Sequence, residues 1–210
     1  MMPSSSHPSP EPPVPDAPST RRDWILTLLW IVPVLFLLLV FLYGKLSQPS
    51  PGSDSMAPRV GQPLADFSLP DLQGHMVQLS SLQGKVVFIN VWATWCPPCV
   101  DEMPTIQRLY DRLHTQGLEV LAISLDALGA QVVAPFVRDY RLTFPVLLDA
   151  RSTIERLYRT SGVPESFIVD KRGRLVDKII GPRDWTHTQM LMLFERLLAA
   201  PVSDVKSGGS

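Results

Sequence analysis

The hydrophobic pattern between residues 59 and 200 alternates between two kinds of segment. Short apolar runs rich in β-branched residues predict buried strands, and they lie at residues 86–91, 118–124, 144–148 and 166–169. Longer segments with apolar residues at helical spacing predict helices, and they lie at residues 97–115, 129–140, 152–159 and 186–199. This order predicts an α/β fold in which a mixed central sheet carries helices on both faces.

Two hairpins complete the predicted domain. The sequence Asp-Lys-Arg-Gly at residues 170–173 is typical of a turn between strands 167–169 and 175–180. A shorter hairpin pairs residues 66–69 with residues 76–79 and forms an N-terminal extension. Residues 59–200 therefore predict one domain.

The chain before residue 59 divides into three segments. Residues 1–23 are rich in proline, which cannot support a packed core, and predict a disordered tail. Residues 24–44 carry no charged side chain. At about 1.5 Å per residue this length spans the roughly 30 Å hydrocarbon core of a membrane, so a single transmembrane helix is predicted. Residues 45–58 predict a flexible linker, and residues 201–210 predict a second disordered tail.

The flanking charges predict the orientation of this anchor. Arg21 and Arg22 precede the apolar segment, whereas Lys45 and Arg59 follow it, so the positive-inside rule favours a cytoplasmic N-terminus. A cleaved signal peptide is the alternative, but its apolar region would be about 7–15 residues and would end at a small-residue cleavage site. We expect an anchor in the cytoplasmic (inner) membrane, with the domain facing the periplasm or the outside.

Charge and composition exclude several classes of protein. The 19 Lys and Arg against 20 Asp and Glu give a net charge of −1, which lacks the basic surplus of a nucleic-acid binder. Apolar residues make up 45% of the chain, enough for a core. The two cysteines cannot form a disulfide scaffold or a four-cysteine metal site, and we expect no metal and no cofactor.

Both cysteines lie where the predicted strand 86–91 gives way to the predicted helix. Cys99 follows Cys96 by about one helical turn, close enough for a disulfide. Cys96 falls at the helix N-terminus, where free N–H groups and the macrodipole favour an anion, so we expect a lowered thiol pKa. Pro97 and Pro98 suit the first helical turn. The pattern predicts that a Cys96 thiolate attacks a disulfide and that Cys99 resolves the mixed intermediate.

Two other uses of the cysteines are disfavoured. A purely stabilising disulfide would close a very short loop and remove little entropy from the unfolded chain. A metal site needs more ligands than two thiolates, and the nearest histidines in the sequence are His75 and His114. A cysteine pair with this spacing between strand and helix therefore favours redox chemistry.

The residues around the cysteines carry a resemblance to known proteins. Residues 91–99, Val-Trp-Ala-Thr-Trp-Cys-Pro-Pro-Cys, followed by Glu102, resemble the thioredoxin superfamily. More narrowly, they are similar to membrane-anchored thiol–disulfide oxidoreductases of the TlpA/ResA/CcmG (DsbE) type. The resemblance covers about residues 60–198 and implies a thioredoxin fold.

The resemblance also implies a substrate-binding surface beside the disulfide. Pro164 would be a cis proline that faces the cysteines and leaves the Val163 backbone free to pair with an extended substrate. An ordinary proline at a strand start is the alternative. The implied substrate-binding residues are Trp95, Pro97, Pro98, Val163 and Pro164.

Glu102 lies three positions after Cys99, at the edge of the apolar helix face. A half-buried carboxylate there would have a raised pKa and relay the Cys99 proton. The alternative is an acid in the first turn that interacts with the macrodipole. Thioredoxin has a buried Asp where this chain has Asn90, whereas the TlpA/ResA group has a Glu at the Glu102 position, which favours the relay.

Other residues receive structural interpretations. Trp92 is predicted to lie in the core, whereas Glu165 either borders the substrate groove, as the resemblance implies, or is a solvated acid. We interpret Trp185, His187 and the arginines between residues 151 and 159 as surface or packing residues.

Together these features predict a membrane-anchored, extracytoplasmic protein-disulfide reductase. The resemblance implies client proteins with disulfides, apocytochrome c during cytochrome c maturation among them, and a membrane-embedded thiol electron donor. An oxidase would use the same motif at a different reduction potential. A peroxiredoxin-like peroxidase would carry Thr where Ala93 stands, and a copper metallochaperone would use a longer cysteine spacing and a downstream His.

Overall fold

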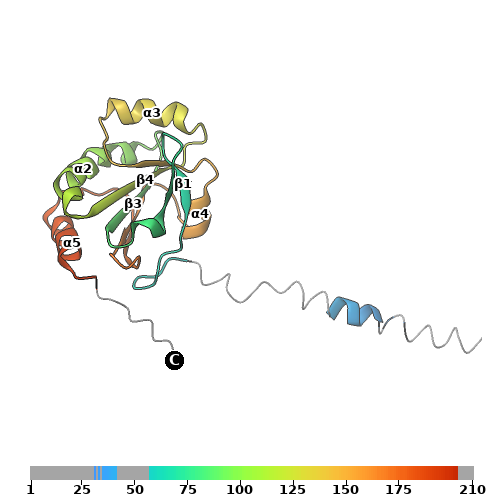
Figure 1. Cartoon of the computed structure of the whole chain (residues 1–210). Helices are drawn as coiled ribbons and strands as arrows, with labels where there is room; N and C mark the ends of the chain where they lie inside the picture. The colour runs from blue at the N-terminus through green and yellow to red at the C-terminus, as the bar shows by residue number, and fades with distance from the viewer. Residues whose placement is uncertain (1–30, 32, 34, 42–56, 203–210) are drawn as a thin grey trace, which may run out of the picture. The chain divides into compact units, whose positions relative to one another are not determined.

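The computed structural model describes residues 31, 33, 35–41 and 57–202 (Figure 1). Residues 35–41 are helical, and their side chains are exposed. Among the described residues, no helix is both long and apolar enough to cross a membrane. The predicted tail 1–23, most of the predicted span 24–44, nearly all of the linker 45–58 and most of the tail 201–210 lie outside the described residues.

Within residues 57–202 every predicted strand and helix forms, and no end moves by more than two residues. The α-helices are α2 (Pro97–Leu113), α3 (Ala130–Asp139), α4 (Thr153–Tyr158) and α5 (Thr188–Ala199). The strands are β1 (Ser68–Pro70), β2 (Met76–Gln78), β3 (Val86–Trp92), β4 (Leu118–Ser124), β5 (Val146–Leu148), β6 (Glu165–Val169) and β7 (Leu175–Ile180). Short 3₁₀ helices η1 (Leu79–Leu82) and η2 (His114–Gln116) follow β2 and α2.

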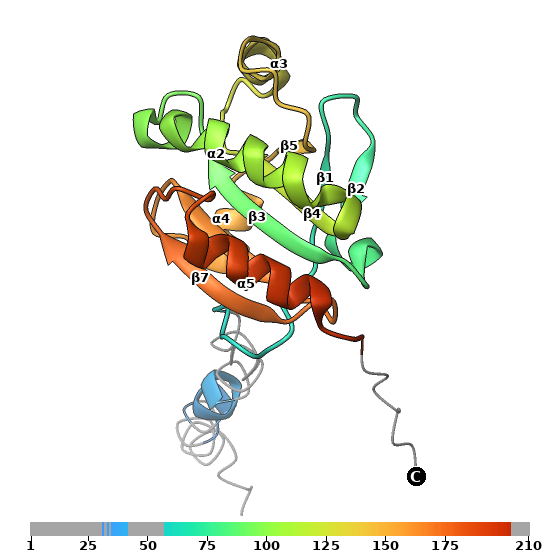
Figure 2. The same cartoon turned by 90° about the vertical axis from the view of Figure 1, so that its left-hand side faces the viewer.

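The central sheet is mixed, as the sequence predicts. Its strand order is β5-β4-β3-β6-β7, with β3 parallel to β4 and antiparallel to β6. The predicted N-terminal hairpin forms a separate two-stranded sheet of β1 and β2 (Figure 2). Every residue of β3 is buried, because β3 has strands on both sides and packed layers above and below.

Helices cover both faces of the sheet. Alternate residues of β3 point to opposite sides, so Val86 and Phe88 join one apolar cluster while Val87 and Ile89 join the other. The first cluster includes α2 and α5, which lie side by side over β3 in Figure 2. The second cluster includes α4 and the segment from Leu64 to Leu79.

Helix α2 begins beside the end of the central strand. The backbone N–H of Cys96 donates to the Ala93 carbonyl at 3.2 Å and closes the turn that connects β3 with α2. The buried face of α2 contains Met103, Ile106, Leu109 and Leu113 at spacings of three and four residues. Packing of this face against the sheet fixes both cysteines at one edge of the sheet.

Candidate active site

Cys96 and Cys99 form a disulfide with a Cα–Cα distance of 5.3 Å. Cys99 is fully buried, and Cys96 is 5% exposed. Cys96 is the N-cap of α2, and its Sγ accepts the backbone N–H of Cys99 at 3.3 Å. This donor and the helix N-terminus favour negative charge on Cys96 when the bond is reduced.

The turn before Cys96 is held by an aspartate that our sequence analysis missed. One carboxylate oxygen of Asp126 accepts from the Thr94 hydroxyl at 2.6 Å, and the other accepts from the Thr94 backbone N–H at 2.9 Å. The Ser124 hydroxyl also donates to Asp126 at 2.8 Å. The sequence did contain a signal for this contact, since Asp126 follows the strand 118–124. The carboxyl ends of parallel neighbouring strands lie close together, so an acid there can reach the turn after β3.

The peptide bond between Val163 and Pro164 is cis, as the resemblance implies. The Val163 carbonyl oxygen lies 3.7 Å from Cys96 Sγ, and the Pro164 carbonyl accepts from the Gly181 N–H at 2.9 Å. Two segments 67 residues apart are thus brought together at the disulfide.

An exposed apolar surface surrounds the buried sulfurs. Trp95 is 67% exposed, Pro97 is exposed, and Pro98 and Val163 are half-buried. Trp92 is fully buried, which confirms its predicted place in the core. The substrate-binding role of the exposed residues stays a prediction.

Glu102 is more deeply buried than the half-buried acid we expected, with 3% of its surface exposed. Its Oε1 accepts from Asn90 Nδ2 at 2.7 Å. Its Oε2 accepts from Trp185 Nε1 at 3.1 Å and from the Arg183 backbone N–H at 3.2 Å. Burial raises the pKa of Glu102 above its ordinary value, although these hydrogen bonds to the carboxylate oppose the rise.

The segment before α5 completes this carboxylate's surroundings, which sequence reasoning missed. Trp185 was interpreted only as a surface or packing residue. It is fully buried, and its indole N–H contacts Glu102 across 83 residues of sequence. Its neighbour His187 is the N-cap of α5 and accepts the Gln189 N–H at 3.5 Å. A local pattern contains no signal for the contact between Trp185 and Glu102.

A surface cleft of about 320 Å³ has Glu102 among its lining residues. Its lining residues are Asp101, Glu102, Thr105, Pro182, Arg183 and Asp184. The cleft therefore brings solvent next to Glu102, although the residue itself is buried.

Glu165 is fully buried, so its interpretation as a solvated acid is wrong, and a buried side chain does not border a groove either. Its Oε2 accepts from the Ser161 N–H at 2.9 Å. Its Oε1 lies 2.5 Å from Lys178 Nζ, which makes an ion pair although Oε1 accepts no well-oriented hydrogen bond. The paired strand β7 supplies the charge that compensates this acid, and the acid holds the loop before Pro164.

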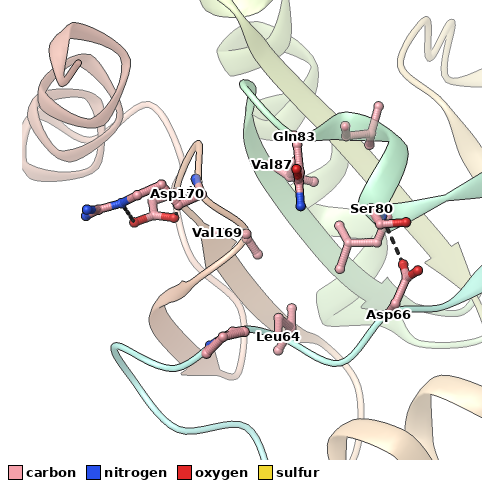
Figure 3. A pocket seen from close by; sticks show the side chains of 12 residues that line it. Leu64, Asp66, Ser80, Gln83, Val87, Val169 and Asp170 are labelled. Carbon is pink, nitrogen blue, oxygen red and sulfur yellow. Dashed lines mark hydrogen bonds and ion pairs between the residues drawn. The ribbon is translucent and has the colours of Figure 1, made fainter. Parts of the chain in front are cut away.

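A second hollow, of about 110 Å³, lies where β3 begins and β6 ends (Figure 3). Leu64, Val87 and Val169 give it apolar walls, and Asp66 stands at its rim. Burial tends to raise the pKa of Asp66, but hydrogen bonds from Gln78, Ser80 and Phe67 outweigh it and lower the pKa. Because β3 runs from this hollow toward Cys96, the hollow and the disulfide lie at opposite ends of the strand.

Comparison with known proteins agrees with this geometry. The AhpC/TSA family profile matches residues 60–178, more than half of the chain. A thiol–disulfide oxidoreductase ResA of Bacillus cereus is 39% identical over 129 residues, which are 61% of this chain and 74% of that protein.

Two solved structures share the fold. A candidate thiol:disulfide interchange protein DsbE of Chlorobium tepidum is 29% identical, with a TM-score of 0.63, covering 68% of this chain and 99% of that one. StoA of Bacillus subtilis is 27% identical, with a TM-score of 0.53, covering 62% of this chain and 95% of that one. The chain therefore belongs to the AhpC/TSA family, and it is a thiol–disulfide oxidoreductase of the ResA type with a thioredoxin-like fold.

Proposed function

We propose that the protein is a membrane-anchored reductase that breaks disulfides in client proteins outside the cytoplasmic membrane. The observation that carries the reaction is the Cys96–Cys99 pair at the start of α2, next to the cis peptide bond before Pro164. The charge-free segment 24–44 supports the anchor. Two arginines close before this segment, Arg21 and Arg22, against Lys45 alone directly after it, support an extracytoplasmic domain.

In the reduced protein, Cys96 is the nucleophile. Its thiolate attacks one sulfur of the client disulfide, forms a mixed disulfide with that sulfur and releases the other as a thiolate, which takes a proton from solvent. The N-terminal position on α2 stabilises the attacking anion. Exposed Trp95 and the Val163 backbone lie where an extended client segment would contact the protein.

Cys99 completes the reaction and needs a base, because it is buried. Its thiol loses a proton to the Glu102 carboxylate, and the resulting thiolate attacks Cys96 Sγ. The Cys96–Cys99 disulfide forms, the bond to the client breaks, and the client leaves as a second thiolate. Two electrons thus pass to the client, and Glu102 passes its proton to solvent through the adjacent cleft.

The proposed client class includes apocytochrome c, whose haem-binding Cys-X-X-Cys-His segment must be reduced before haem attachment. The resemblance to CcmG-type proteins supports this client. A thiol donor within the membrane would return two electrons to the Cys96–Cys99 disulfide, since the reaction leaves the protein oxidised.

Trapping of the mixed disulfide tests the reaction. The Cys99→Ser variant keeps Cys96 as its single thiol, so any covalent complex must be formed by Cys96. We expect the reduced variant to accumulate a complex with an oxidised Cys-X-X-Cys-His peptide, and dithiothreitol to release the peptide.

The matched variant Cys96→Ser leaves only the buried Cys99 and should form no complex. It should also reduce insulin no faster than buffer does. Complex formation by Cys96→Ser, or none by Cys99→Ser with any oxidised peptide, would contradict the mechanism. Equal trapping of an insulin-derived disulfide peptide would remove the support for an apocytochrome client.

A further inference from the structure

Asn90 lies between Glu102 and Ser166, and only the nitrogen of its side-chain amide is hydrogen-bonded. Its Nδ2 donates to Glu102 Oε1 at 2.7 Å and to Ser166 Oγ at 3.0 Å. Its Oδ1 is buried and has no hydrogen-bond partner among the described residues. An unpaired buried amide oxygen costs free energy. The arrangement therefore satisfies Asn90 incompletely while it serves the Glu102 carboxylate.

The other oxygen of Glu102 determines where a proton binds. Oε2 accepts from Trp185 Nε1 and from the Arg183 backbone N–H. Both groups are donors only, so neither can accept a hydrogen bond from a proton on Oε2. The proton of a neutral Glu102 therefore belongs on Oε1, where it faces Asn90.

With its NH₂ group toward Oε1, Asn90 cannot accept a hydrogen bond from a proton on this oxygen. A half-turn of the carboxamide exchanges Nδ2 and Oδ1 with little change in shape, and this torsion is soft. Oδ1 then accepts from the Glu102 O–H. It also accepts from the Ser166 hydroxyl, which can act as either donor or acceptor.

We propose that Asn90 is a positioning residue of the proton relay and that its amide turns over when Glu102 gains or loses a proton. The inference rests on the proposed function, in which Glu102 takes the proton of Cys99. The NH₂ end holds the carboxylate, and the oxygen end holds the carboxylic acid. The proton gained by Oε1 therefore has one defined position while Cys99 attacks.

On the side of Glu102 that faces the sheet, the Asn90 amide is the direct hydrogen-bond partner of the carboxylate. Asn90 from β3 and Ser166 from β6 are uncharged, and the contacts from residues 183 and 185 are a backbone N–H and an indole N–H. Among the described residues, the titratable ones next to Glu102 are Cys99 on α2 and three that line the same cleft, Asp101, Arg183 and Asp184. Burial raises the pKa of Glu102, so the pH at which its two protonation states are equally populated lies closer to neutral.

The sequence permits a direct test, because Asn90 is the chain's single asparagine. Labelling asparagine with ¹⁵N in the side-chain amide yields one NH₂ signal from the full-length chain in detergent micelles. The disulfide stays intact, so that neither cysteine titrates. A ¹³C label on the glutamate carboxyls follows Glu102 in the same sample, and its signal is identified by its loss in Glu102→Gln.

We expect the chemical shifts of the Asn90 NH₂ group to change with pH, with the same midpoint as the Glu102 carboxyl signal. The nuclear Overhauser contact between this NH₂ group and the Ser166 β-protons should be present above the midpoint and lost below it. In the Glu102→Gln variant, the pH dependence of the Asn90 signals should disappear. A contact that persists on both sides of the midpoint, or a pH dependence that survives in Glu102→Gln, would overturn the inference.

The reductase assay tests the relay separately, because the spectra require no turnover. A Glu102→Gln variant that releases the client from the mixed disulfide at the wild-type rate at every pH would overturn the role of Glu102, and with it the catalytic use of the turning amide. Slower release by Glu102→Gln together with an unchanged contact in the wild type would leave the relay standing and overturn only the turning amide.

Discussion

Glu102 and Glu165 are both buried acids, but their partners give them different roles. Glu102 accepts hydrogen bonds from uncharged donors, those of Asn90, Trp185 and the Arg183 backbone, so none of its hydrogen-bond partners supplies a positive charge that would fix it in the ionised state. Glu165 faces the Lys178 ammonium at 2.5 Å, and this ion pair compensates its charge in the interior. The first acid is thus suited to exchanging a proton, and the second to holding a loop.

Replacement of Glu102 by Gln should change how stability depends on pH. Burial raises the pKa of Glu102 in the folded chain, so the folded state binds this proton more tightly than the unfolded state. The resulting stabilisation is fully present below the unfolded pKa of about 4.3 and is lost as pH rises through the folded pKa. Relative to Glu102→Gln, the oxidised wild type should therefore lose free energy of unfolding across this window. Urea unfolding of both proteins at a series of pH values measures these free energies. Free energies of unfolding that depend on pH in the same way in the two proteins would contradict the prediction.

At the scale of elements, side chains from outside the helices bind the backbone at the start of α4 and at the end of α5. Asp149 accepts the backbone N–H groups of Thr153 and Ile154 at 2.8 Å and 2.7 Å, at the start of α4. Lys171 donates to the Leu198 and Ala200 carbonyls at 2.6 Å and 3.0 Å, at the end of α5. These contacts satisfy backbone groups that a helix leaves unpaired at its ends.

The Asp149→Ala substitution should lower the free energy of unfolding by about 1–2 kcal/mol, because it removes both acceptors from the start of α4. A helix of six residues has little stability of its own to offset the loss. Urea unfolding of the oxidised protein measures the change. Asp139→Ala is the matched control, since Asp139 is an exposed acid at the C-terminal end of α3, and its effect should stay within about 0.5 kcal/mol. Equal losses in the two variants would contradict the capping role.

At the scale of the whole molecule, backbone hydrogen bonds attach residues 61–64, near the start of the domain, to residues 173–175. Gly61 N–H donates to the Leu175 carbonyl at 2.7 Å, and Leu64 N–H donates to the Gly173 carbonyl at 2.9 Å. Leu64 also joins the apolar cluster on the α4 side of the sheet. The domain from residue 57 onward therefore contains both of its apolar clusters and the cysteine pair.

A chain that begins at residue 57 should fold and reduce insulin as the full-length chain does, because no described residue before 57 contributes to either cluster. If residues 24–44 are the anchor, the full-length chain should sediment with membranes while the shortened chain stays in the supernatant. Fractionation of expressing cells followed by the insulin assay measures both properties. Membrane sedimentation of the shortened chain would contradict the proposed anchor.

The extent of prediction from sequence differs between the fold and the site. Strand and helix positions were predicted to within two residues, because periodicity and turn residues act over short stretches of chain. The cysteine pair at the start of α2 was predicted for the same reason. By contrast, the burial of Glu165 was predicted wrongly, since its compensating charge comes from Lys178 on the neighbouring strand.

By itself, the sequence determined the order of elements, the mixed sheet and the position of Cys96 at a helix N-terminus, all of which follow from neighbouring residues. Only the tertiary structure decided what surrounds those cysteines. It brings Asp126 to Thr94 across 32 residues, Ser166 to Asn90 across 76 and Trp185 to Glu102 across 83. Asp126 had a signal in its position after a strand, but no local pattern encodes the partners of Asn90 and Glu102, because sheet pairing and helix packing bring these side chains together.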